Sequence, residues 1–425
     1  MATASDAPKA GFRPSMLIYD TRYRSITIQV FVLILFVLGL VWLLDNTAKN
    51  LAAVDKDFNF GFLWTRAGYD INQRLVEYTN DSTHGRALLI GILNTLLVAV
   101  LGCILATVVG VLAGILRLSR NWLISRMMTV YVEIFRNIPV LLWILLIFVI
   151  LTETTPSPRD FRVTDEMIAA GEAPKASPFF FDSIVITNRS AVIPEPLFTR
   201  SLGNIDIGIF LISIDLLAFL AAIAAGVFAN RALVRHAQRV QEATGIRPVT
   251  WWKSILLILG PPILTLYALG FYLGYGELAG FNFVGGIQVL HSFTALWLAL
   301  SLYTGAFIAE NVRAGILSVS KGQTEAASAL GLRPGRTMRL VILPQALRVI
   351  IPPLISQYLN LTKNTSLAAA VSYMDIKGTL GGITMNQTGR ELECMLLMML
   401  IYLVLSLMIS TVINIYNHAI RLKER

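Results

Sequence analysis

The stretch Lys321–Pro344, KGQTEAASALGLRPGRTMRLVILP, decides how this chain is interpreted, because it is a polar segment set between two apolar spans. Residues 323–330 favour a short helix, and Gly331 is placed to stop it just beyond its last turn. Pro334 can start a second short helix, which Pro344 would end. The pattern predicts two short helices joined at a glycine corner, and we call this the corner segment. Such a projection suits docking to another protein better than it suits chemistry.

The composition indicates a polytopic membrane protein. Mean hydropathy is +0.66, 55% of residues are hydrophobic and only 14% are charged. The net charge of +9 does not indicate nucleic-acid binding, because the basic residues lie in short loops, as membrane topology requires. The two cysteines, Cys103 and Cys394, exclude a disulfide framework. The four histidines are scattered without ligand spacing, so no metal site is predicted.

Apolar runs long enough to cross a bilayer predict an all-α, polytopic membrane helix bundle with about eight transmembrane helices. We expect these spans at 26–44, 87–116, 127–150, 205–229, 254–275, 291–311, 347–370 and 395–416. The first run resembles the apolar part of a signal peptide, but it is too long and no convincing cleavage site follows closely, so we interpret it as a retained helix.

The basic residues predict the orientation of the bundle. They gather in the loops after the second, fourth and sixth spans, whereas the loop 273–290 holds Glu277 and no Lys or Arg. The positive-inside rule therefore places both termini and the corner segment in the cytoplasm. The longer segments 45–86 and 152–204 fall outside, and the second is expected to be an irregular loop or small cap.

Small residues recur every four positions in the second span and again in the sixth. Such stripes let helices approach closely in lipid, and we favour packing within the chain over a subunit interface. The residues are Gly102, Ala106, Gly110 and Gly114, then Ser301, Gly305 and Ala309.

The seventh span is unusually polar for a membrane helix. It should therefore be shielded within the bundle, kinked and facing a polar cavity. Lys363 is the clearest intramembrane charge, with snorkelling to the outer interface as an equal alternative. The residues are Pro352, Pro353, Gln357, Asn360, Lys363 and Asn364.

Two charged pairs are spaced three residues apart on predicted helices, so each pair shares one helix face. Glu133 and Arg136 begin the third span, where a structural ion pair is favoured over substrate contact. Glu310 and Arg313 end the sixth. Glu310 could contact a substrate ammonium group, but an ion pair with Arg313 is favoured because charges are tolerated near the membrane boundary.

The corner segment resembles the cytoplasmic EAA loop of ABC-importer permeases. That pattern is EAA, a glycine four residues beyond its last alanine, then a hydrophobe and LP, and the counterparts here are Glu325, Ala326, Ala327, Gly331, Val341, Leu343 and Pro344. Val341 stands where isoleucine is common. The flanking motifs YVEIFRNIPVLL, SLYTGAFIAENVRAGI and LTKNTSLAAA resemble the polar-amino-acid (histidine/glutamine permease-like) branch, most closely Q-type permeases of general L-amino-acid transporters. The resemblance covers 85–151 and 291–425.

The resemblance implies a type I importer core of five helices. The expected parts are 1–84 with an extra helix and periplasmic loop, 85–151 with two core helices, 152–290 as an insertion with two extra helices, and 291–425 as the rest of the core with the coupling loop 321–344.

The resemblance also implies a permease subunit that moves L-amino acids from a periplasmic binding protein into the cytoplasm, in the inner membrane of a bacterium. Its corner segment would enter a groove of an ATP-binding cassette ATPase dimer, with Glu325 at the helix start and Gly331 allowing the turn. A second, related permease would complete a heterodimer. The chain lacks the GxxxxGK[ST] cradle, so it cannot hydrolyse ATP alone. The resemblance implies a transport subunit and not an enzyme, with ATP and magnesium bound to a separate ATPase subunit.

An amino acid is zwitterionic, so its site should combine an acceptor with donors or a cation. Asn360, Lys363, Asn364 and Thr365 could supply the donors. The alternative function is an ion-coupled secondary transporter of small polar solutes, which needs an acid within the membrane. Asp215, in the predicted fourth span, is the only obvious candidate, and it lies in the insertion. The sequence does not decide which amino acids are carried or what the insertion does.

Overall fold

The computed structural model describes residues 16–19, 21–53, 57–162, 174–181, 183–208 and 211–420. They fall into two compact units, residues 1–61 and 62–425. The first unit holds a short helix, α1 (Met16–Tyr19), and one long helix, α2 (Thr21–Ala53). The long helix contains the predicted first span, and its apolar side chains are exposed along its length, as lipid contact requires.

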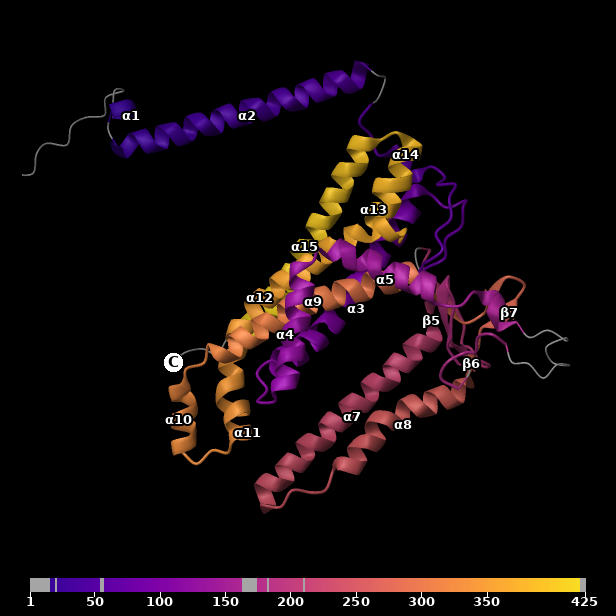
Figure 1. Ribbon diagram of the computed structural model, residues 1–425, viewed down its shortest axis with the longest axis vertical. Coiled ribbons are helices and arrows are strands. Elements are labelled where there is room, and N and C mark those ends of the chain that lie inside the picture. Colours follow the sequence, from indigo (N-terminus) through magenta and orange to yellow (C-terminus); the bar gives the residue numbers. More distant parts are fainter. Residues whose placement is uncertain are drawn as a thin grey trace, which may run out of the picture. The chain divides into compact units, whose positions relative to one another are not determined.

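The second unit is a helix bundle with a small region of strands (Figure 1). Its longer helices are α3 (His84–Leu116), α4 (Trp122–Asn137), α5 (Val140–Thr154), α7 (Ile214–Thr244), α8 (Trp251–Leu269), α9 (His291–Leu317), α12 (Leu343–Asn364) and α15 (Glu391–Ile420). Its short elements are η1 (Gly61–Trp64), η2 (Pro158–Phe161), α10 (Lys321–Ala329), α11 (Pro334–Thr337), η3 (Met338–Ile342), η4 (Thr365–Val371), α13 (Ile376–Gly378), η5 (Thr379–Thr384) and α14 (Met385–Thr388). Among the described residues, seven helices could each cross a membrane, and the bent pair α4–α5 makes an eighth. The predicted bundle is thereby confirmed.

Short antiparallel strands occur in the predicted insertion, whose first segment was expected to be an irregular loop or small cap. They are β1 (Val185–Ile186), β2 (Ser190–Ile193), β3 (Glu195–Phe198), β4 (Asn204–Asp206), β5 (Leu211–Ser213), β6 (Phe271–Gly274), β7 (Glu277–Ala279), β8 (Asn282–Val284) and β9 (Ile287–Leu290). One sheet has the order β1-β2-β9, and the others are the pairs β3-β6, β4-β5 and β7-β8. Ser190 pairs with Leu290 and Glu195 with Gly274, so strands before α7 are tied to strands after α8.

These strands correct two predicted spans. The fourth was expected at 205–229, but β4 and β5 occupy its start, and α7 runs from Ile214 to Thr244. The fifth was expected to reach 275, but α8 ends at Leu269, followed by Gly270 with a φ of 67°. The chain then pairs with β3, which satisfies its backbone groups without a helix.

The third predicted span, 127–150, is wrong as a single helix. It is broken into α4 and α5, which meet at an angle of 107°. Pro139 has no N–H to continue the helical ladder, and its ring forces the preceding Ile138 into an extended conformation, with φ −102° and ψ 133°. On the two sides of the bend, α4 and α5 both pack against α9.

The core forms where α3, α5 and α12 pack against α9. A Cβ atom on Gly110 would lie 2.6 Å from the Ile308 side chain, and one on Gly114 would lie 2.7 Å from the Ala309 carbonyl. Only glycine therefore permits this approach of α3 to α9. The Ser301 hydroxyl donates a hydrogen bond to the Gly102 carbonyl at 3.4 Å. The small-residue stripes pack within the chain, as predicted.

Candidate coupling site

The corner segment has the predicted glycine corner. The N–H of Gly331 binds the Ser328 carbonyl at 2.9 Å, and the N–H of Leu332 binds the Ala327 carbonyl at 3.1 Å. Together with a φ of 74° at Gly331, these two bonds form a Schellman motif, which satisfies carbonyls at the end of α10. No heavy atom lies within 4 Å of a Cβ built on Gly331. The glycine is therefore required by the backbone conformation and not by crowding.

Most of the corner segment faces outward. Ala327 and Thr337 are buried where α10 packs against α11 and η3, whereas Glu325 and Ala326 are exposed. Sequence reasoning missed the exposed apolar side chains on this segment: Leu330 is 81% exposed and Leu340 is 62% exposed. The available signal was the occurrence of leucines, such as Leu330, in an otherwise polar part of the segment. Apolar side chains held in the open at a helix corner suit a protein interface.

Two expectations about this segment need correction. Helix α10 begins at Lys321, so Glu325 lies in its second turn and not at the helix start. Pro344 does not end the second helix but lies in the first turn of α12. Between α11 and α12, η3 is a single π turn, in which the Leu343 N–H reaches the Met338 carbonyl five residues back. This wider turn accommodates a proline that has no N–H to give.

An ion-pair cluster lies where α3 and α9 end. The Arg313 Nη2 atom is 2.7 Å from Glu310 Oε1, so the predicted pair is confirmed. Arg117, whose side chain is only 9% exposed, lies 2.5 Å from Glu310 and 3.8 Å from Glu133. Sequence reasoning treated Arg117 as a loop charge, because nothing in its local spacing reveals partners on α4 and α9. A little-exposed guanidinium with two carboxylate neighbours ties three helices together.

The predicted pairing of Glu133 with Arg136 is wrong. Arg136 instead places its guanidinium over the Phe307 ring, 5.4 Å from the centroid, and Glu133 faces Arg117. Tyr131, on the same helix, donates its hydroxyl to the Leu302 carbonyl at 2.7 Å. Contacts with α9 therefore outweigh a local pair three residues apart, which contributes only a few tenths of a kcal/mol, about 0.2–0.5, in an isolated helix.

The residues predicted to meet a substrate are not gathered into one enclosed site. Asn360 and Lys363 are exposed on the surface of α12, and Asn364 is half-buried. Thr365 is buried and donates its hydroxyl to the Thr362 carbonyl at 2.7 Å. Glu310 lies with Arg117 and Arg313, at the end of α9 that leads into the corner segment. A substrate role for these residues stays a prediction.

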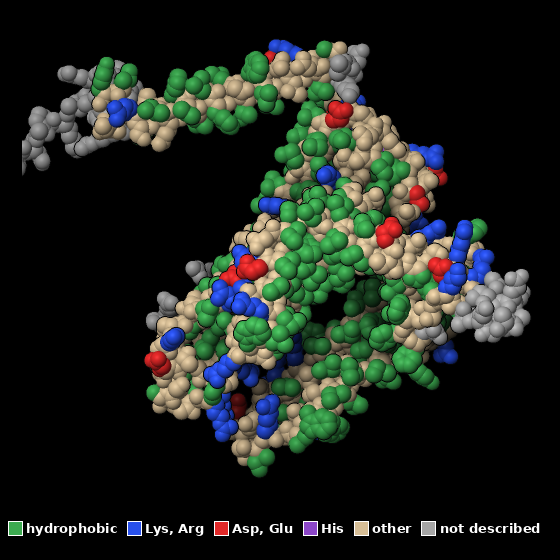
Figure 2. Space-filling view, viewed as in Figure 1, with side chains coloured by type: hydrophobic (Ala, Val, Ile, Leu, Met, Phe, Trp, Pro, Cys, Tyr) green, Lys and Arg blue, Asp and Glu red, His purple; other side chains and the backbone are tan. Residues whose placement is uncertain are grey.

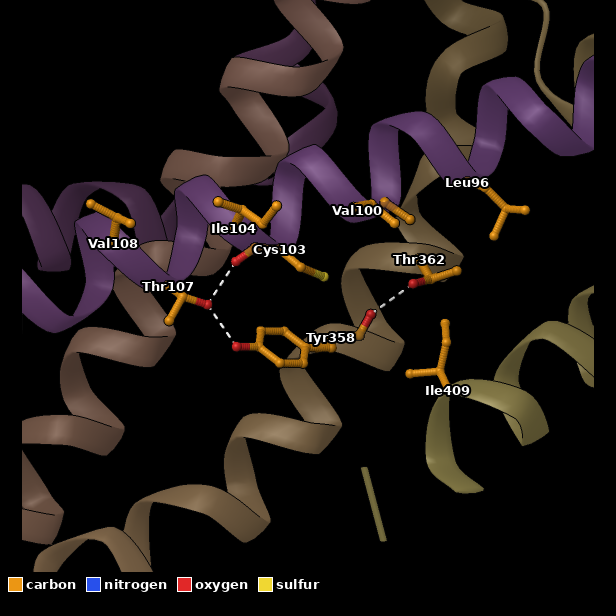
Figure 3. Close-up of a pocket in the computed structure, with 10 residues that line it drawn as sticks. Leu96, Val100, Cys103, Ile104, Thr107, Val108, Tyr358, Thr362 and Ile409 are labelled. Carbon is orange, nitrogen blue, oxygen red and sulfur yellow. Dashed lines mark hydrogen bonds between the residues drawn. The ribbon is translucent and has the colours of Figure 1, made fainter. Parts of the chain in front are cut away.

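A cavity of about 530 Å³ lies between α3, α12 and α15 (Figure 3). The Thr107 and Tyr358 hydroxyls bind each other at 2.6 Å, and the Thr362 hydroxyl donates to the Tyr358 carbonyl at 2.9 Å. The residues that line the cavity are Leu96, Ala99, Val100, Cys103, Ile104, Thr107, Val108, Tyr358, Thr362 and Ile409. Of these described residues none is charged, so the cavity offers no charged group to pair with a zwitterion.

Asp215 does not lie mid-span, as the secondary-transporter alternative required. It lies in the first turn of α7, where its carboxylate accepts the Ser201 hydroxyl at 2.6 Å and the Leu202 N–H at 2.8 Å. These contacts anchor the chain entering α7, as an acid near a helix N-terminus commonly does.

A second buried acid lies outside the spanning helices. The Asp375 carboxylate caps α13, accepting the Gly378 N–H at 2.8 Å and the Tyr402 hydroxyl at 3.2 Å. Its burial raises the pKa of Asp375 to about 6, against the lowering effect of these hydrogen bonds. The neighbouring turn is fastened to α3, because Asn94 donates to the Met374 carbonyl at 2.8 Å and Tyr373 donates to the Asn94 carbonyl at 3.2 Å.

Comparison with known proteins decides the family. Residues 106–422 match the family described as the binding-protein-dependent transport system inner membrane component. The chain belongs to this family. The permease is 66% identical to the glutamate/glutamine/aspartate/asparagine transport system permease protein BztB of Rhodobacter capsulatus, over 100% of both chains. It is 45% identical to the general L-amino acid transport system permease protein AapQ of Rhizobium johnstonii, over 97% of this chain and 96% of that one.

A solved amino acid ABC transporter with histidines superposes on this permease with a TM-score of 0.43 and 17% sequence identity, covering 79% of this chain and 95% of that chain. The family therefore rests on the sequence matches. They confirm the predicted ABC-permease family, and they make this chain a membrane-embedded transport subunit and not an enzyme.

Proposed function

We propose that this permease moves L-amino acids, with acidic and amide side chains among them, from a periplasmic binding protein into the cytoplasm. The substrate class is supported by the named substrates of the relative that is 66% identical over its whole length. The general L-amino acid relative supports the wider class. Competition between labelled glutamate and unlabelled glutamine for uptake tests the overlap directly.

The observation that carries the coupling proposal is the corner segment itself. It holds an exposed helix, α10, against α11, and α11 continues through η3 into the spanning helix α12. A movement imposed on α10 would therefore reach α12 without crossing a flexible loop. We propose that an ATPase dimer, which binds ATP and magnesium, docks on this segment, and that a related permease completes a heterodimer. This arrangement requires the corner segment and both termini to be cytoplasmic.

Glu325→Lys tests the coupling. The Glu325 side chain is exposed on α10, so the variant should insert normally but lose amino-acid uptake and uncouple ATP hydrolysis. Glu277→Lys makes the same charge change on an exposed acid of β7 and is the matched control. Uptake by Glu325→Lys at the level of the control would refute the coupling role. Uptake that survives ATP depletion but stops with an ionophore would favour a secondary transporter.

A further inference from the structure

The hairpin of α7 and α8 carries exposed basic side chains at the end where its two helices are joined. We call them the basic turn: Arg231, Arg235, Arg239, Arg247 and Lys253. Between residues 216 and 276 the only acidic residue is Glu242. Figure 2 shows Lys and Arg side chains gathered toward this end of the hairpin, and hydrophobic side chains along its length.

The length of α7 places the basic turn at the membrane surface. Its 31 residues extend about 46 Å at about 1.5 Å each, whereas the hydrocarbon core is about 30 Å thick. The last turns of α7 therefore project beyond the hydrocarbon. Arg231, Arg235 and Arg239 recur every four residues, so they follow one side of α7 from the membrane boundary into that projecting part. The partner helix α8 has 19 residues, about the length that the hydrocarbon needs.

Aromatic residues mark the level of the lipid headgroups beside the basic turn. Trp251 and Trp252 begin α8 and are 68% and 48% exposed. Tryptophan favours the membrane interface, where one side of its ring is apolar and the other is wet. The Lys253 ammonium lies 5.4 Å from the Trp252 ring centroid, and the Arg231 guanidinium lies 5.9 Å from that of Phe228. The basic turn therefore starts at the level of the membrane where these aromatic side chains lie.

The hairpin is built to be surrounded by lipid. The two helices pack closely on each other at Gly226, where a side chain would collide with the Leu257 carbonyl. Their outer faces hold exposed apolar side chains such as Leu220 and Leu264. A hairpin whose sides contact acyl chains brings the cations at its end against phosphate groups.

We propose that the basic turn binds the phosphate groups of anionic phospholipids. A group of four to eight basic residues next to a membrane helix attracts anionic headgroups, whereas a zwitterionic headgroup carries no net charge for it to attract. Both α7 and α9 begin directly after strands of the second unit, at β5 and β9, and run away from them (Figure 1). The basic turn thus lies on the membrane face from which the corner segment also emerges. Anionic lipid would hold the insertion at that face.

The test measures lipid bound to the full-length protein in mixed micelles of equal phosphatidylglycerol and phosphatidylcholine. Native mass spectrometry should show phosphatidylglycerol enriched on the wild-type protein. Arg231→Gln/Arg235→Gln/Arg239→Gln should lose enrichment by about fivefold for each charge removed. The matched control replaces the same three arginines with lysine and should keep the enrichment, because the charge is kept.

Three results would overturn the proposal. The first is equal enrichment in the glutamine and wild-type proteins, which would leave the arginines as topology signals only. The second is wild-type enrichment that does not fall when salt rises from about 0.05 M to about 0.5 M, since an electrostatic headgroup contact is screened. This arm needs no variant, so it stands even if the glutamine protein fails to fold. The third is weaker ATPase binding by the glutamine variant in pure phosphatidylcholine, which would assign the surface to a protein partner.

Discussion

Replacing Gly331 with alanine tests the corner segment through its backbone alone. A Cβ at this position would contact nothing within 4 Å, so crowding cannot explain an effect. The φ of 74° is the only obstacle, and a residue with a Cβ loses about 1–2 kcal/mol in this left-handed conformation. Alanine regains about 0.4–1 kcal/mol by restricting the unfolded chain. The net cost is roughly 1 kcal/mol, or about a fivefold loss in the ratio of formed to opened corner.

Two assays report that change. Trypsin should cleave after the exposed Arg336 about fivefold faster in Gly331→Ala, because cleavage follows the population of the opened form. Amino-acid uptake driven by the assembled importer in proteoliposomes should fall several-fold, while the amount of inserted protein stays constant. The second assay rests on the proposed coupling role, and the first does not.

Gly322→Ala is the matched control. Gly322 lies in the same segment and also has open space around its Cβ position, but its backbone is helical. Alanine is favoured over glycine there by about 0.5–1 kcal/mol, so this variant should be cleaved no faster than wild type. Equal cleavage of Gly331→Ala and Gly322→Ala would show that the left-handed corner does not stabilise the segment.

Three further predictions concern stability, measured by thermal unfolding in detergent. Gly110→Ala places a methyl group 2.6 Å from Ile308 and should destabilise the protein by about 1–3 kcal/mol, whereas Gly322→Ala, a helical glycine with open space around its Cβ position, should not; similar melting temperatures would contradict this. Arg117→Met should cost about 1.5–3 kcal/mol through its lost charged hydrogen bond, and an unchanged melting temperature would show that the cluster contributes nothing. Because burial raises the pKa of Asp375 to about 6, the folded protein keeps a proton that the unfolded chain releases above roughly pH 4. Stability should therefore fall between about pH 4 and pH 6 and level off above, and Asp375→Asn should remove this fall. An identical dependence of stability on pH in both proteins would assign the fall to other groups.

The parts of the fold that could be predicted are those fixed by local chemistry. The corner at Gly331 follows from a helix that needs a left-handed residue to end it. The close approach at Gly110 follows from small side chains at helical spacing. The pair of Glu310 with Arg313 follows from a shared helix face near the membrane boundary. The spanning helices follow from apolar length, and so their number was predictable as well.

What the sequence did not reveal depends on partners far away along the chain. Strand β2 has four residues, and its register with β9 joins Ser190 to Leu290, a hundred residues on, so no local alternation marks it. The break of the third predicted span at Pro139 accompanies packing of both α4 and α5 on α9, a helix far along the chain. The ion pairs of Arg117 were the part of the candidate site that the sequence did not reveal, because its carboxylate partners Glu133 and Glu310 lie on two other helices.

The π turn η3 fixes the direction in which the corner segment faces. Each residue of an α-helix turns the chain by about 100° and advances it by about 1.5 Å, since there are about 3.6 residues per turn. The elements α11, η3 and α12 form one continuous helical segment. Deleting one residue between Thr337 and Leu343 would convert the π turn to an α turn without interrupting this segment. The helical segment would stay continuous, yet Leu330 would point about 100° away from its present direction. The number of residues in this one turn therefore fixes the direction of the corner segment about the helix axis. A docking partner can be complementary to only one such direction.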